Sequence, residues 1–302
     1  MNNDPDPYDV AIVGGSFAGL TAALYLARAR RRVVIFDTGV TRNRFADAGH
    51  GFLGMDGHSP EAMRMAGRAD VLAYPTITLR EERVARLERQ GDLFRLDGVL
   101  AHRVILAYGM RDVLPAIPGL QAGWGQWAMQ CPYCHGYEAA DLPTGVMMTS
   151  DTAPHHLSML RDLTHDQVLF TNGYALTDEV RADVLATGVP IHDAPVVGFD
   201  AVGGLQAVLL ADGTRVPRQV LYLVTRSEPS CDLAAQIGCQ MADGPMGAYV
   251  KVGGMQQTSV PGVWSAGDLN RPAYGAVFAA SDGAMAGVSA HHSFHFPTPP
   301  FA

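Results

Sequence analysis

The sequence has very little lysine, little cysteine and no long apolar run. Lys251 is the only lysine, and 30 acidic residues against 22 basic ones give a net charge of −8. The sequence has no basic stripe, which argues against nucleic acid as a partner. No apolar run approaches the ~18–20 residues that span a bilayer, so we expect no membrane segment. The first six residues are acidic and polar, unlike a signal peptide, and we expect a cytoplasmic protein.

Two of the four cysteines form the motif Cys131-Pro132-Tyr133-Cys134. Two intervening residues let the sulfurs meet in a small disulfide ring at a helix start, and Pro132 suits the first turn of that helix. The exposed amides and the dipole there lower a thiol pKa, as a redox cysteine requires. The alternative is half of a zinc site. Cys231 and Cys239 are a poor second pair because they lie eight positions apart. We therefore predict a redox dithiol and interpret the other two cysteines as small buried residues.

The N-terminal segment has the pattern of a dinucleotide-binding unit. A strand, a glycine turn, a helix and a second strand are predicted over residues 8–13, 14–19, 20–31 and 33–36. Gly14 permits the tight turn, Gly19 permits close helix–strand packing, and the helix N-terminus faces a pyrophosphate. Ser16 stands where a second glycine is usual, and its small side chain still lets the backbone approach a phosphate. Asp37, which ends the second strand, is expected to bind ribose hydroxyls.

The next segments complete a first domain. A helix over 60–70, a β-meander over 79–87 and 93–99, and a buried strand over 104–109 are predicted. Pro115, Pro118 and Gly119 then break the chain. The segments 41–45 and 50–54, which contain glycine and histidine, are interpreted as an ordinary surface connection.

The middle of the chain repeats the strand–turn–helix–strand order over residues 145–170, but its turn has no glycine where a pyrophosphate would lie. A helix over 176–185 and strands over 196–199, 205–210 and 220–224 follow, with an Asp212-Gly213 hairpin turn. The last part contains a strand over 262–266, followed by Gly267-Asp268, and a closely packed helix over 274–289. Three histidines in the tail have no carboxylate or cysteine among them, so we predict no metal site there.

The chain resembles the low-molecular-weight thioredoxin reductase family of FAD disulfide reductases. The resemblance covers essentially the whole chain and is carried, in order, by 14–19, Ala107-Tyr108-Gly109, 131–134 and Gly267-Asp268-Leu269. It implies an α/β fold of two Rossmann-like three-layer domains. Residues 1–114 and 246–302 form a discontinuous FAD domain, and residues 115–245 form an inserted NADPH-domain-like unit. A homodimer is also expected from this resemblance.

The resemblance further implies the roles of individual residues. Cys134 lies against the flavin and Cys131 exchanges with the substrate, while Asp268 binds the ribityl chain. Ala276 and Val277 approach the flavin ring from the last helix. The full set of cofactor-binding residues is predicted to be Gly14, Ser16, Phe17, Ala18, Gly19, Asp37, Arg44, Gly109, Gly267, Asp268, Ala276 and Val277.

The sequence departs from the reductases of this family at the residue after the second cysteine. They have Asp there, and this chain has His135. An imidazole can still carry a proton to or from a thiolate near neutral pH, so His135 is predicted to be catalytic. A local structural role on the helix is the alternative. The run His135-Gly136-Tyr137-Glu138 looks closer to the branch with gliotoxin-type dithiol oxidases.

A second departure lies in the NADPH domain. The family's Gly-x-Gly-x-x-Ala corresponds here to residues 148–153, where Met148 occupies the tight turn and Asp151 adds a negative charge. Lost backbone access and repulsion both oppose pyrophosphate binding, so we predict that NADPH binds weakly or not at all.

Three functions remain open. The first is a thioredoxin reductase-like enzyme that acts on thioredoxin or a small dithiol and takes electrons from ferredoxin or another donor. The second is an oxidase that forms disulfides with oxygen as acceptor. The third is a flavoprotein sensor or binding module without turnover, against which the intact dithiol argues. In the tail, Phe294, Phe296 or Phe301 is hypothesised to stack on the exposed flavin face.

Overall fold

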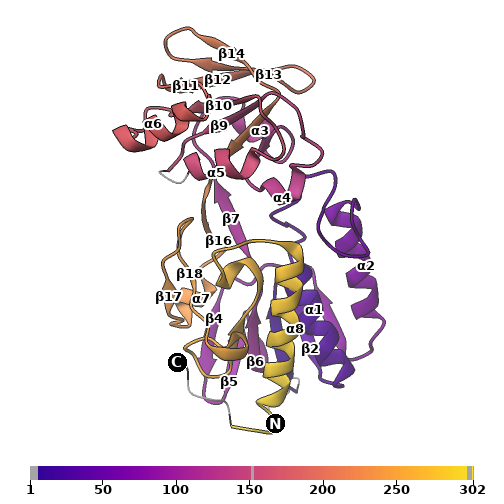
Figure 1. Ribbon diagram of the computed structural model, residues 1–302. Coiled ribbons are helices and arrows are strands. Elements are labelled where there is room, and N and C mark those ends of the chain that lie inside the picture. The colour runs from indigo at the N-terminus through magenta and orange to yellow at the C-terminus, as the bar shows by residue number, and fades with distance from the viewer. Residues whose placement is uncertain (1–5, 151–152, 298–300, 302) are drawn as a thin grey trace. The chain divides into compact units, whose positions relative to one another are not determined.

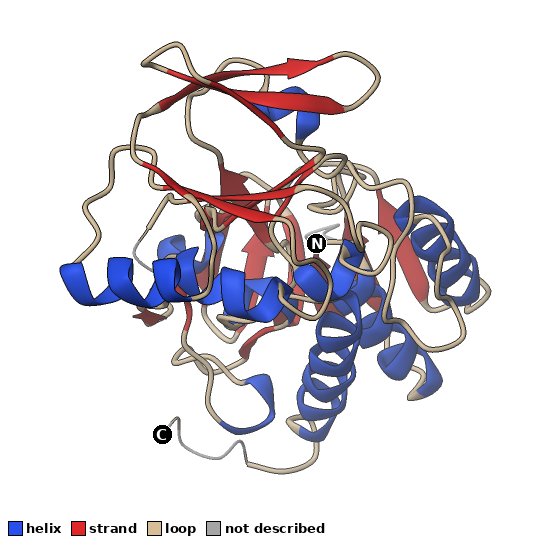
Figure 2. Cartoon of the chain, turned by 45° about the horizontal axis from the view of Figure 1, so that its top comes forward, coloured by secondary structure: helices blue, strands red, loops and turns tan. Residues whose placement is uncertain are grey.

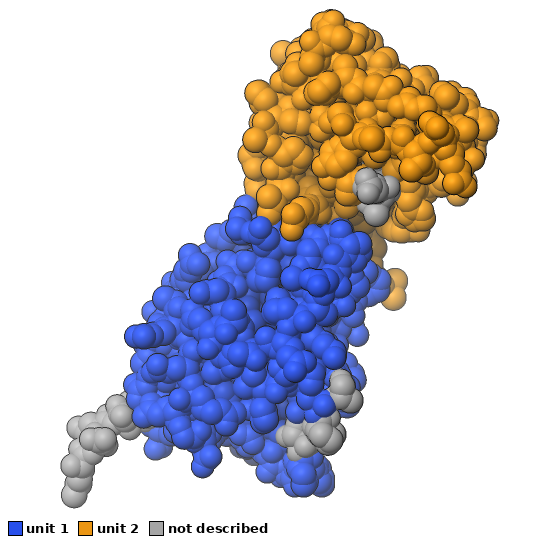
Figure 3. Space-filling view, turned by 90° about the vertical axis from the view of Figure 1, so that its left-hand side faces the viewer, with its two compact units in different colours: residues 1–44, 60–111, 227–302 blue, residues 45–59, 112–226 orange. Residues whose placement is uncertain are grey.

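The computed structural model describes residues 6–150, 153–297 and 301. The chain divides into two compact units, coloured separately in Figure 3. Unit 1 consists of Met1–Arg44, Pro60–Arg111 and Ser227–Ala302, and unit 2 consists of Phe45–Ser59 and Asp112–Arg226. A short loop from the N-terminal part of the chain therefore belongs to unit 2.

Unit 1 is built on a seven-stranded sheet in the order β3-β2-β1-β6-β5-β4, with β19 also paired to β6. Its strands are β1 (Tyr8–Val13), β2 (Val33–Phe36), β3 (Ile77–Arg80), β4 (Leu87–Gln90), β5 (Leu93–Leu96), β6 (Val99–Leu106) and β19 (Val263–Ser265). The pairs among β3, β2, β1, β6 and β19 are parallel, and β4–β5 and β5–β6 are antiparallel. The carboxyl ends of the parallel strands therefore meet along one edge.

Two long helices of unit 1 pack against each other unusually closely. They are α1 (Phe17–Arg28) and α8 (Ala276–His292), which lie side by side in Figure 1. A Cβ atom at Gly283 would overlap the carbonyl oxygen of Ala18, and one at Gly287 would press on that of Ala22. Only glycine lets the two backbones approach to this distance. This contact between α1 and α8, here called the glycine seam, brings together segments from the N-terminal and C-terminal parts of the chain.

Unit 1 also contains a third long helix and several short elements. They are α2 (Pro60–Leu72), α7 (Leu233–Gln236), β17 (Met241–Ala242), β18 (Tyr249–Val250) and the 3₁₀ turns η1 (Gly254–Gln256) and η2 (Gly267–Asn270). The chain passes between the units along β7 (Met110–Val113) and β16 (Arg226–Pro229), which pair in a two-stranded sheet.

Unit 2 has three layers. A parallel sheet in the order β11-β10-β9-β15-β8 lies between helices on one face and the antiparallel sheet β12-β13-β14 on the other (Figures 1 and 2). The parallel strands are β8 (Ala128–Met129), β9 (Thr144–Met147), β10 (Gln167–Phe170), β11 (Ile191–His192) and β15 (Val220–Leu223). The other elements are β12 (Val196–Ala201), β13 (Leu205–Leu210), β14 (Arg215–Pro217), α3 (Leu120–Gly123), α4 (Pro132–His135), α5 (Ala153–Leu160) and α6 (Asp178–Ala186).

Successive side chains along the strands of unit 2 point to opposite faces of the parallel sheet and form two separate hydrophobic cores. Met147 and Phe170 face the antiparallel sheet, whereas Val146 and Leu169 face the helices. Every residue of β9, β10 and β15 is buried, as expected for parallel strands that are covered on both faces. The predicted α/β fold with Rossmann-like parallel sheets is confirmed.

Several predicted boundaries were wrong. Helix α1 begins at Phe17 rather than at residue 20 and ends at Arg28, because Arg30 adopts a left-handed φ of 59°. Residues 81–86 are not part of a strand: β3 ends at Arg80 and joins the parallel sheet. The Asp212-Gly213 turn joins β13 to the short strand β14 rather than to the strand over 220–224. Within the described residues, no helix is both long and apolar enough to cross a bilayer.

The compact units also differ from the predicted domain limits. Residues 227–245 belong to unit 1 and not to the inserted unit. The reason is that α7 holds the β-meander, because the Gln236 side chain accepts a hydrogen bond from Leu87 N and donates one to Ala85 O. Conversely, the loop over 45–59 belongs to unit 2.

Candidate active site

The two cysteines of the motif form a disulfide in unit 2, with their Cα atoms 5.3 Å apart. Cys131 is the N-cap of α4, and Pro132 is the first residue of the helix. The predicted helix start is therefore present, but α4 is a single turn of 4 residues. A helix of one turn has a weaker dipole at its N-terminus than the longer helix that the sequence interpretation assumed.

Gly136 closes the dithiol turn. Its N–H donates to the carbonyl of Pro132 over 2.8 Å. A Cβ atom there would overlap both that carbonyl and the side chain of Leu163. Tyr133 and Tyr137, on either side of this turn, are 83% and 85% exposed. The disulfide is thus flanked by aromatic rings that face solvent.

His135 is half-buried at the end of α4. Burial lowers its pKa, and the charge of nearby His50 lowers it further, while Glu138 acts in the opposite sense. The ring of His135 is therefore neutral at neutral pH and able to accept a proton.

His50 is the residue that the sequence interpretation missed. Its ring meets that of His135 edge-on, with centroids 6.5 Å apart. Its Nε2 lies 3.4 Å from Glu138 Oε1, and its Nδ1 lies 3.4 Å from Asp56 Oδ2. The surface connection that we predicted over 50–54 is thus part of the dithiol region. The sequence offers only its unusual His-Gly-Phe-Leu-Gly composition as a signal.

A second histidine supports the strand that leads into the dithiol. His156 on α5 donates from Nε2 to the carbonyl of Gln130, the residue before Cys131, over 3.2 Å. Its Nδ1 is buried and has no hydrogen-bond partner among the described residues. Burial lowers the pKa of His156 more than the bond to Gln130 raises it.

The glycine turn of unit 1 has the geometry of a phosphate cradle. Gly14 has a φ of 109°, and a Cβ atom there would overlap the carbonyl of Ala107. A Cβ atom at Gly19 would overlap the carbonyl of Gly14. Ser16 is the N-cap of α1 but makes no side-chain cap hydrogen bond to the first turn. Phe17 and Ala18 open this helix, so the helix start lies at the glycine motif, and phosphate binding there stays a prediction.

Asp37 lies beside this turn. Its Oδ1 accepts a hydrogen bond from Gly15 N over 3.2 Å, and its Oδ2 lies 3.3 Å from Nη1 of the buried Arg64. Glu61 also pairs with Arg64, at 2.7 Å. Arg64, on α2, is a second residue that the sequence interpretation missed. A buried arginine holds the expected ribose-binding carboxylate in place.

The C-terminal residues reach the same sheet edge. Gly267, with a φ of 81°, follows β19, and Asp268 pairs with Arg42 at 3.0 Å. The guanidinium of Arg42 also lies 3.8 Å from the ring centre of Tyr274. Ala276 and Val277 form the first turn of α8, and Gly109, with a φ of 67°, follows β6.

Arg44 differs from the other predicted cofactor residues. It is the last residue of this part of unit 1, and its Nη1 donates to the carbonyl of Thr41 over 2.6 Å. This bond is exposed and lies within its own loop.

Phe294 is one of the three tail rings hypothesised to stack on the flavin. Its ring is held between Arg31 and Arg103, whose guanidinium carbons lie 4.2 Å and 4.8 Å from the ring centre. This position follows the C-terminal end of α8, away from the first turn at residues 276–277. Phe301 lies 5.4 Å from the ammonium group of Lys251.

The turn after β9 in unit 2 is occupied by its own side chains. Met148 is buried, and its carbonyl accepts a hydrogen bond from the amide of Asn172 over 3.5 Å. The Thr149 hydroxyl bonds to the carbonyl of Val224, and the Tyr174 hydroxyl donates to Thr149 O over 2.8 Å. Asp151, the predicted repelling charge, lies outside the described residues.

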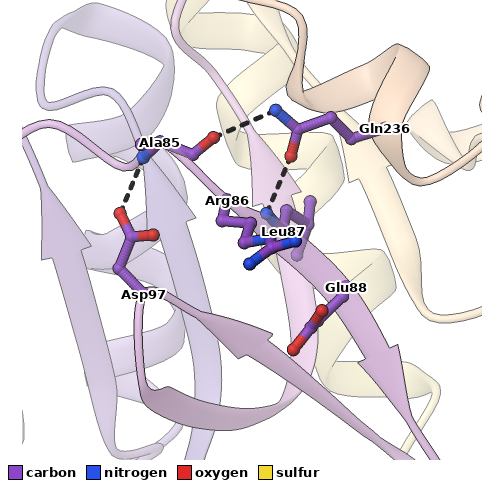
Figure 4. A pocket seen from close by; sticks show the side chains of 6 residues that line it. All are labelled: Ala85, Arg86, Leu87, Glu88, Asp97 and Gln236. Carbon is purple, nitrogen blue, oxygen red and sulfur yellow. Dashed lines mark hydrogen bonds between the residues drawn. The ribbon is translucent and has the colours of Figure 1, made fainter.

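Two further features of the described residues, a surface hollow and the remaining cysteines, have no assigned role in the dithiol or cofactor chemistry. A surface hollow of about 670 Å³ is lined by Ala85, Arg86, Leu87, Glu88, Asp97 and Gln236, and its hydrogen bonds tie the meander together (Figure 4). Cys239 is buried, Cys231 is half-buried, and burial raises the pKa of both thiols. Among the described residues, no three His, Cys, Asp or Glu side chains gather as a metal site.

The sequence pattern of the pyridine nucleotide-disulphide oxidoreductase family matches residues 8–284. The chain belongs to this family. As a pyridine nucleotide-disulphide oxidoreductase, it is similar to thioredoxin reductase tcpT of Claviceps purpurea, with 31% identity over 279 residues and 86% of each chain covered. It is 29% identical to thioredoxin reductase sirT of Leptosphaeria maculans over 310 residues, which covers 95% of this chain and 94% of that one.

A solved oxidoreductase from Agrobacterium tumefaciens has the same fold, with a TM-score of 0.91 and 39% identity over 96% of this chain and 99% of that chain. This chain, residues 1–302, is therefore a thioredoxin reductase-like FAD-dependent disulfide oxidoreductase. The cradle at Gly14, the acid at Asp37 and the sheet-edge residues Gly109 and Gly267 fit an extended dinucleotide such as FAD.

Proposed function

We propose that the chain exchanges electrons between FAD and an external dithiol or disulfide through Cys131 and Cys134, without NADPH. The observation that carries the proposal is the turn after β9. In a dinucleotide site this turn exposes glycine amides to a pyrophosphate. Here Met148 is buried and the carbonyls of residues 148 and 149 are bound by Asn172 and Tyr174, which supports loss of that site.

The position that would bind the adenosine end of NADPH also supports the loss of NADPH binding. Arg181, on α6, is linked through Asp193 to Thr171, the residue that follows β10. Its two terminal nitrogens pair with the two carboxylate oxygens of Asp193, at 3.0 Å and 2.7 Å. A bidentate pair of this kind occupies the donors that a 2′-phosphate would need. We therefore assign the electron supply to ferredoxin or another donor.

The chemistry at the dithiol follows from the residues of the site. In the direction that oxidises a dithiol, a substrate thiolate bonds to Sγ of Cys131 as the Cys131–Cys134 bond breaks, and Cys134 leaves as the thiolate. Reduction of a substrate disulfide runs through the same steps in reverse. The second substrate thiolate then displaces Cys131, which gives the substrate disulfide and the reduced pair. His135 accepts a proton from the incoming thiol and returns it to the leaving sulfur.

Bound FAD supplies the two-electron exchange with the reduced pair. Gly14, Ser16, Phe17, Ala18 and Gly19 would hold the pyrophosphate, and Asp37 would hold the ribose. Gly109, Gly267, Asp268, Ala276 and Val277 would complete the site along the sheet edge. Arg44 is proposed as a further contact to FAD.

The substrate in this proposal is thioredoxin or a small dithiol. A second function, a dithiol oxidase, is favoured by the same occupied turn. Without a nucleotide donor, electrons enter through the dithiol substrate and leave to oxygen. We also propose a homodimer, which sedimentation velocity would test, and a reducing compartment such as the cytoplasm, which accords with the free Cys231 and Cys239.

The deciding experiment is an anaerobic titration of the flavin protein with NADPH, then with dithiothreitol, then with reduced ferredoxin. We expect no bleaching of the flavin absorbance with NADPH and full bleaching with dithiothreitol. Micromolar NADPH affinity would overturn the proposal. Admission of air separates the two functions, because fast reoxidation with peroxide indicates the oxidase and slow reoxidation the reductase.

A further inference from the structure

The loop over 45–59 is docked onto unit 2 although it lies between β2 and α2 of unit 1 in the sequence. The Gln126 side chain donates to the carbonyl of Phe45 over 2.6 Å, and Phe45 packs against the core of unit 2. A Cβ atom at Gly125 would press on Phe45, so the approach depends on glycine. The loop is thus fixed beside α4.

The loop brings a second imidazole to the dithiol turn. His50, Asp56, His135 and Glu138 form what we call the His50 cluster. The ring of His50 lies between the two carboxylates, 3.4 Å from each, and contacts the ring of His135 at 6.5 Å between centroids. Asp56 is itself held, because it accepts a hydrogen bond from Gly51 N over 2.8 Å.

We infer that His50 is a positioning residue for proton transfer at the dithiol, acting through its contact with His135. The inference rests on the proposed function of His135 as the group that accepts the substrate proton. His50 does not touch the sulfur atoms in this role. It controls how readily His135 takes up the proton.

The physical basis is electrostatic. A proton on His50 opposes a second proton on His135, while the carboxylate of Glu138 favours one, and these are the charged groups that face His135. At a separation of this size in a partly solvated site, one unit charge moves a neighbouring titration by about 0.5–1 pH unit. His50 therefore keeps His135 neutral, as a proton acceptor, further into the acid range.

Two variants separate this role from a merely structural one. His50→Gln retains a hydrogen-bonding side chain near Glu138 but never carries a charge. His50→Arg carries a permanent charge. His58 provides the matched control, because it lies on the same loop, is exposed, and bonds only weakly to the backbone of Asp56.

The test uses the full chain with its flavin. Histidine-labelled protein is titrated by NMR to follow His135, and dithiothreitol reduction of the flavin is timed from about pH 5 to about pH 8.5. We expect H50Q to move both the His135 titration and the acid limb of the rate upward by about 0.5–1 pH unit. On the acid limb, well below the pKa of His135, the rate then falls roughly 3–10-fold. We expect H50R and H58Q to stay near the wild type.

An H50Q protein with the wild-type His135 titration would overturn the inference. So would an H50R protein that shifts as far as H50Q, since the role would then be structural. If dithiothreitol fails to reduce the wild-type flavin, the proposed function fails instead. The NMR titration still decides the inference in that case.

Discussion

The hydroxyl of Tyr174 donates a hydrogen bond to the carbonyl of Thr149, 2.8 Å away, across the turn where a second nucleotide would lie. The turn is therefore closed by residues that follow two strands of unit 2, β9 and β10, and is not merely altered in sequence. Restoring one glycine leaves this closure in place.

We predict that Met148→Gly does not create NADPH binding. The buried side chain is lost, so the free energy of unfolding should fall by about 2–5 kcal/mol, as measured in urea. Met148→Leu retains the volume and should cost less than about 1.5 kcal/mol. Micromolar NADPH binding to the glycine variant, by equilibrium dialysis, would mean that Met148 alone blocks the site.

The indole of Trp264 donates from Nε1 to the Ser289 hydroxyl over 2.8 Å, inside unit 1. Ser289→Ala leaves that buried N–H without its acceptor. We expect a loss of about 1–3 kcal/mol in the free energy of unfolding, together with a changed tryptophan emission. Ser281→Ala, at an exposed position on the same helix, is the control. Equal losses in both variants would argue against the hydrogen bond as the cause.

The seam between α1 and α8 gives a larger expected effect. In Gly283→Val the new side chain collides with the backbone of Ala18, which cannot move without shifting the phosphate cradle. We expect about 3 kcal/mol of destabilisation and a lower flavin content after purification. Ser281→Val adds a β-branched residue to the exposed face of α8 and should keep the flavin. Full flavin loading of G283V would contradict the close packing.

His156 makes stability depend on pH. The unfolded chain takes up a proton there near pH 6.5, whereas burial holds the folded pKa lower. In that window the unfolded state binds more protons, so stability rises with pH and falls on acidification. We expect His156→Gln to lose less stability than the wild type between about pH 7.5 and about pH 5.5. Urea midpoints at both values measure this.

The control for that series is His165→Gln, since His165 is exposed in the same unit. It should keep the wild-type dependence on pH. Half-buried His135 contributes in the same direction as His156, so the dependence is reduced in H156Q and not abolished. A steeper fall in H156Q than in the wild type would refute the assignment.

The thiol count should follow the structure. Denatured protein without reductant should react with two equivalents of Ellman's reagent, from Cys231 and Cys239. Prior reduction should expose four. In the reduced native protein Cys131 and Cys134 react first, because burial raises the pKa of the other two thiols. Equal rates for all four would show that unit 1 opens readily.

Short apolar runs were the most predictable part of the fold. Tyr8–Val13, Val33–Phe36 and Gln167–Phe170 form strands with the predicted bounds. Each is mostly apolar and is followed by a glycine, an acid or a polar turn, so the neighbouring residues determine where the strand ends. The cradle at Gly14 and Gly19 was predictable for the same reason, because backbone geometry there depends on residue type.

The parts that sequence reasoning missed depend on distant partners. Phe45 bonds to a residue 81 positions away, and nothing within the loop indicates that it leaves unit 1. His50 therefore looked like a surface residue. The alternating charged residues before Leu87 resemble a strand, but they form a loop because Asp97 and Gln236 bind their backbone. Such contacts appear only when the chain is folded.

The glycine seam between α1 and α8 has a consequence for biosynthesis. The first and last long helices of unit 1 are separated by more than 240 positions, so the ribosome must release nearly the whole polypeptide before they can meet. Unit 2 is complete in sequence by Arg226 and can fold while the remainder is still being made. Until release, the apolar face of α1 lacks its neighbour, and nascent chains that stall late are the ones most exposed to aggregation.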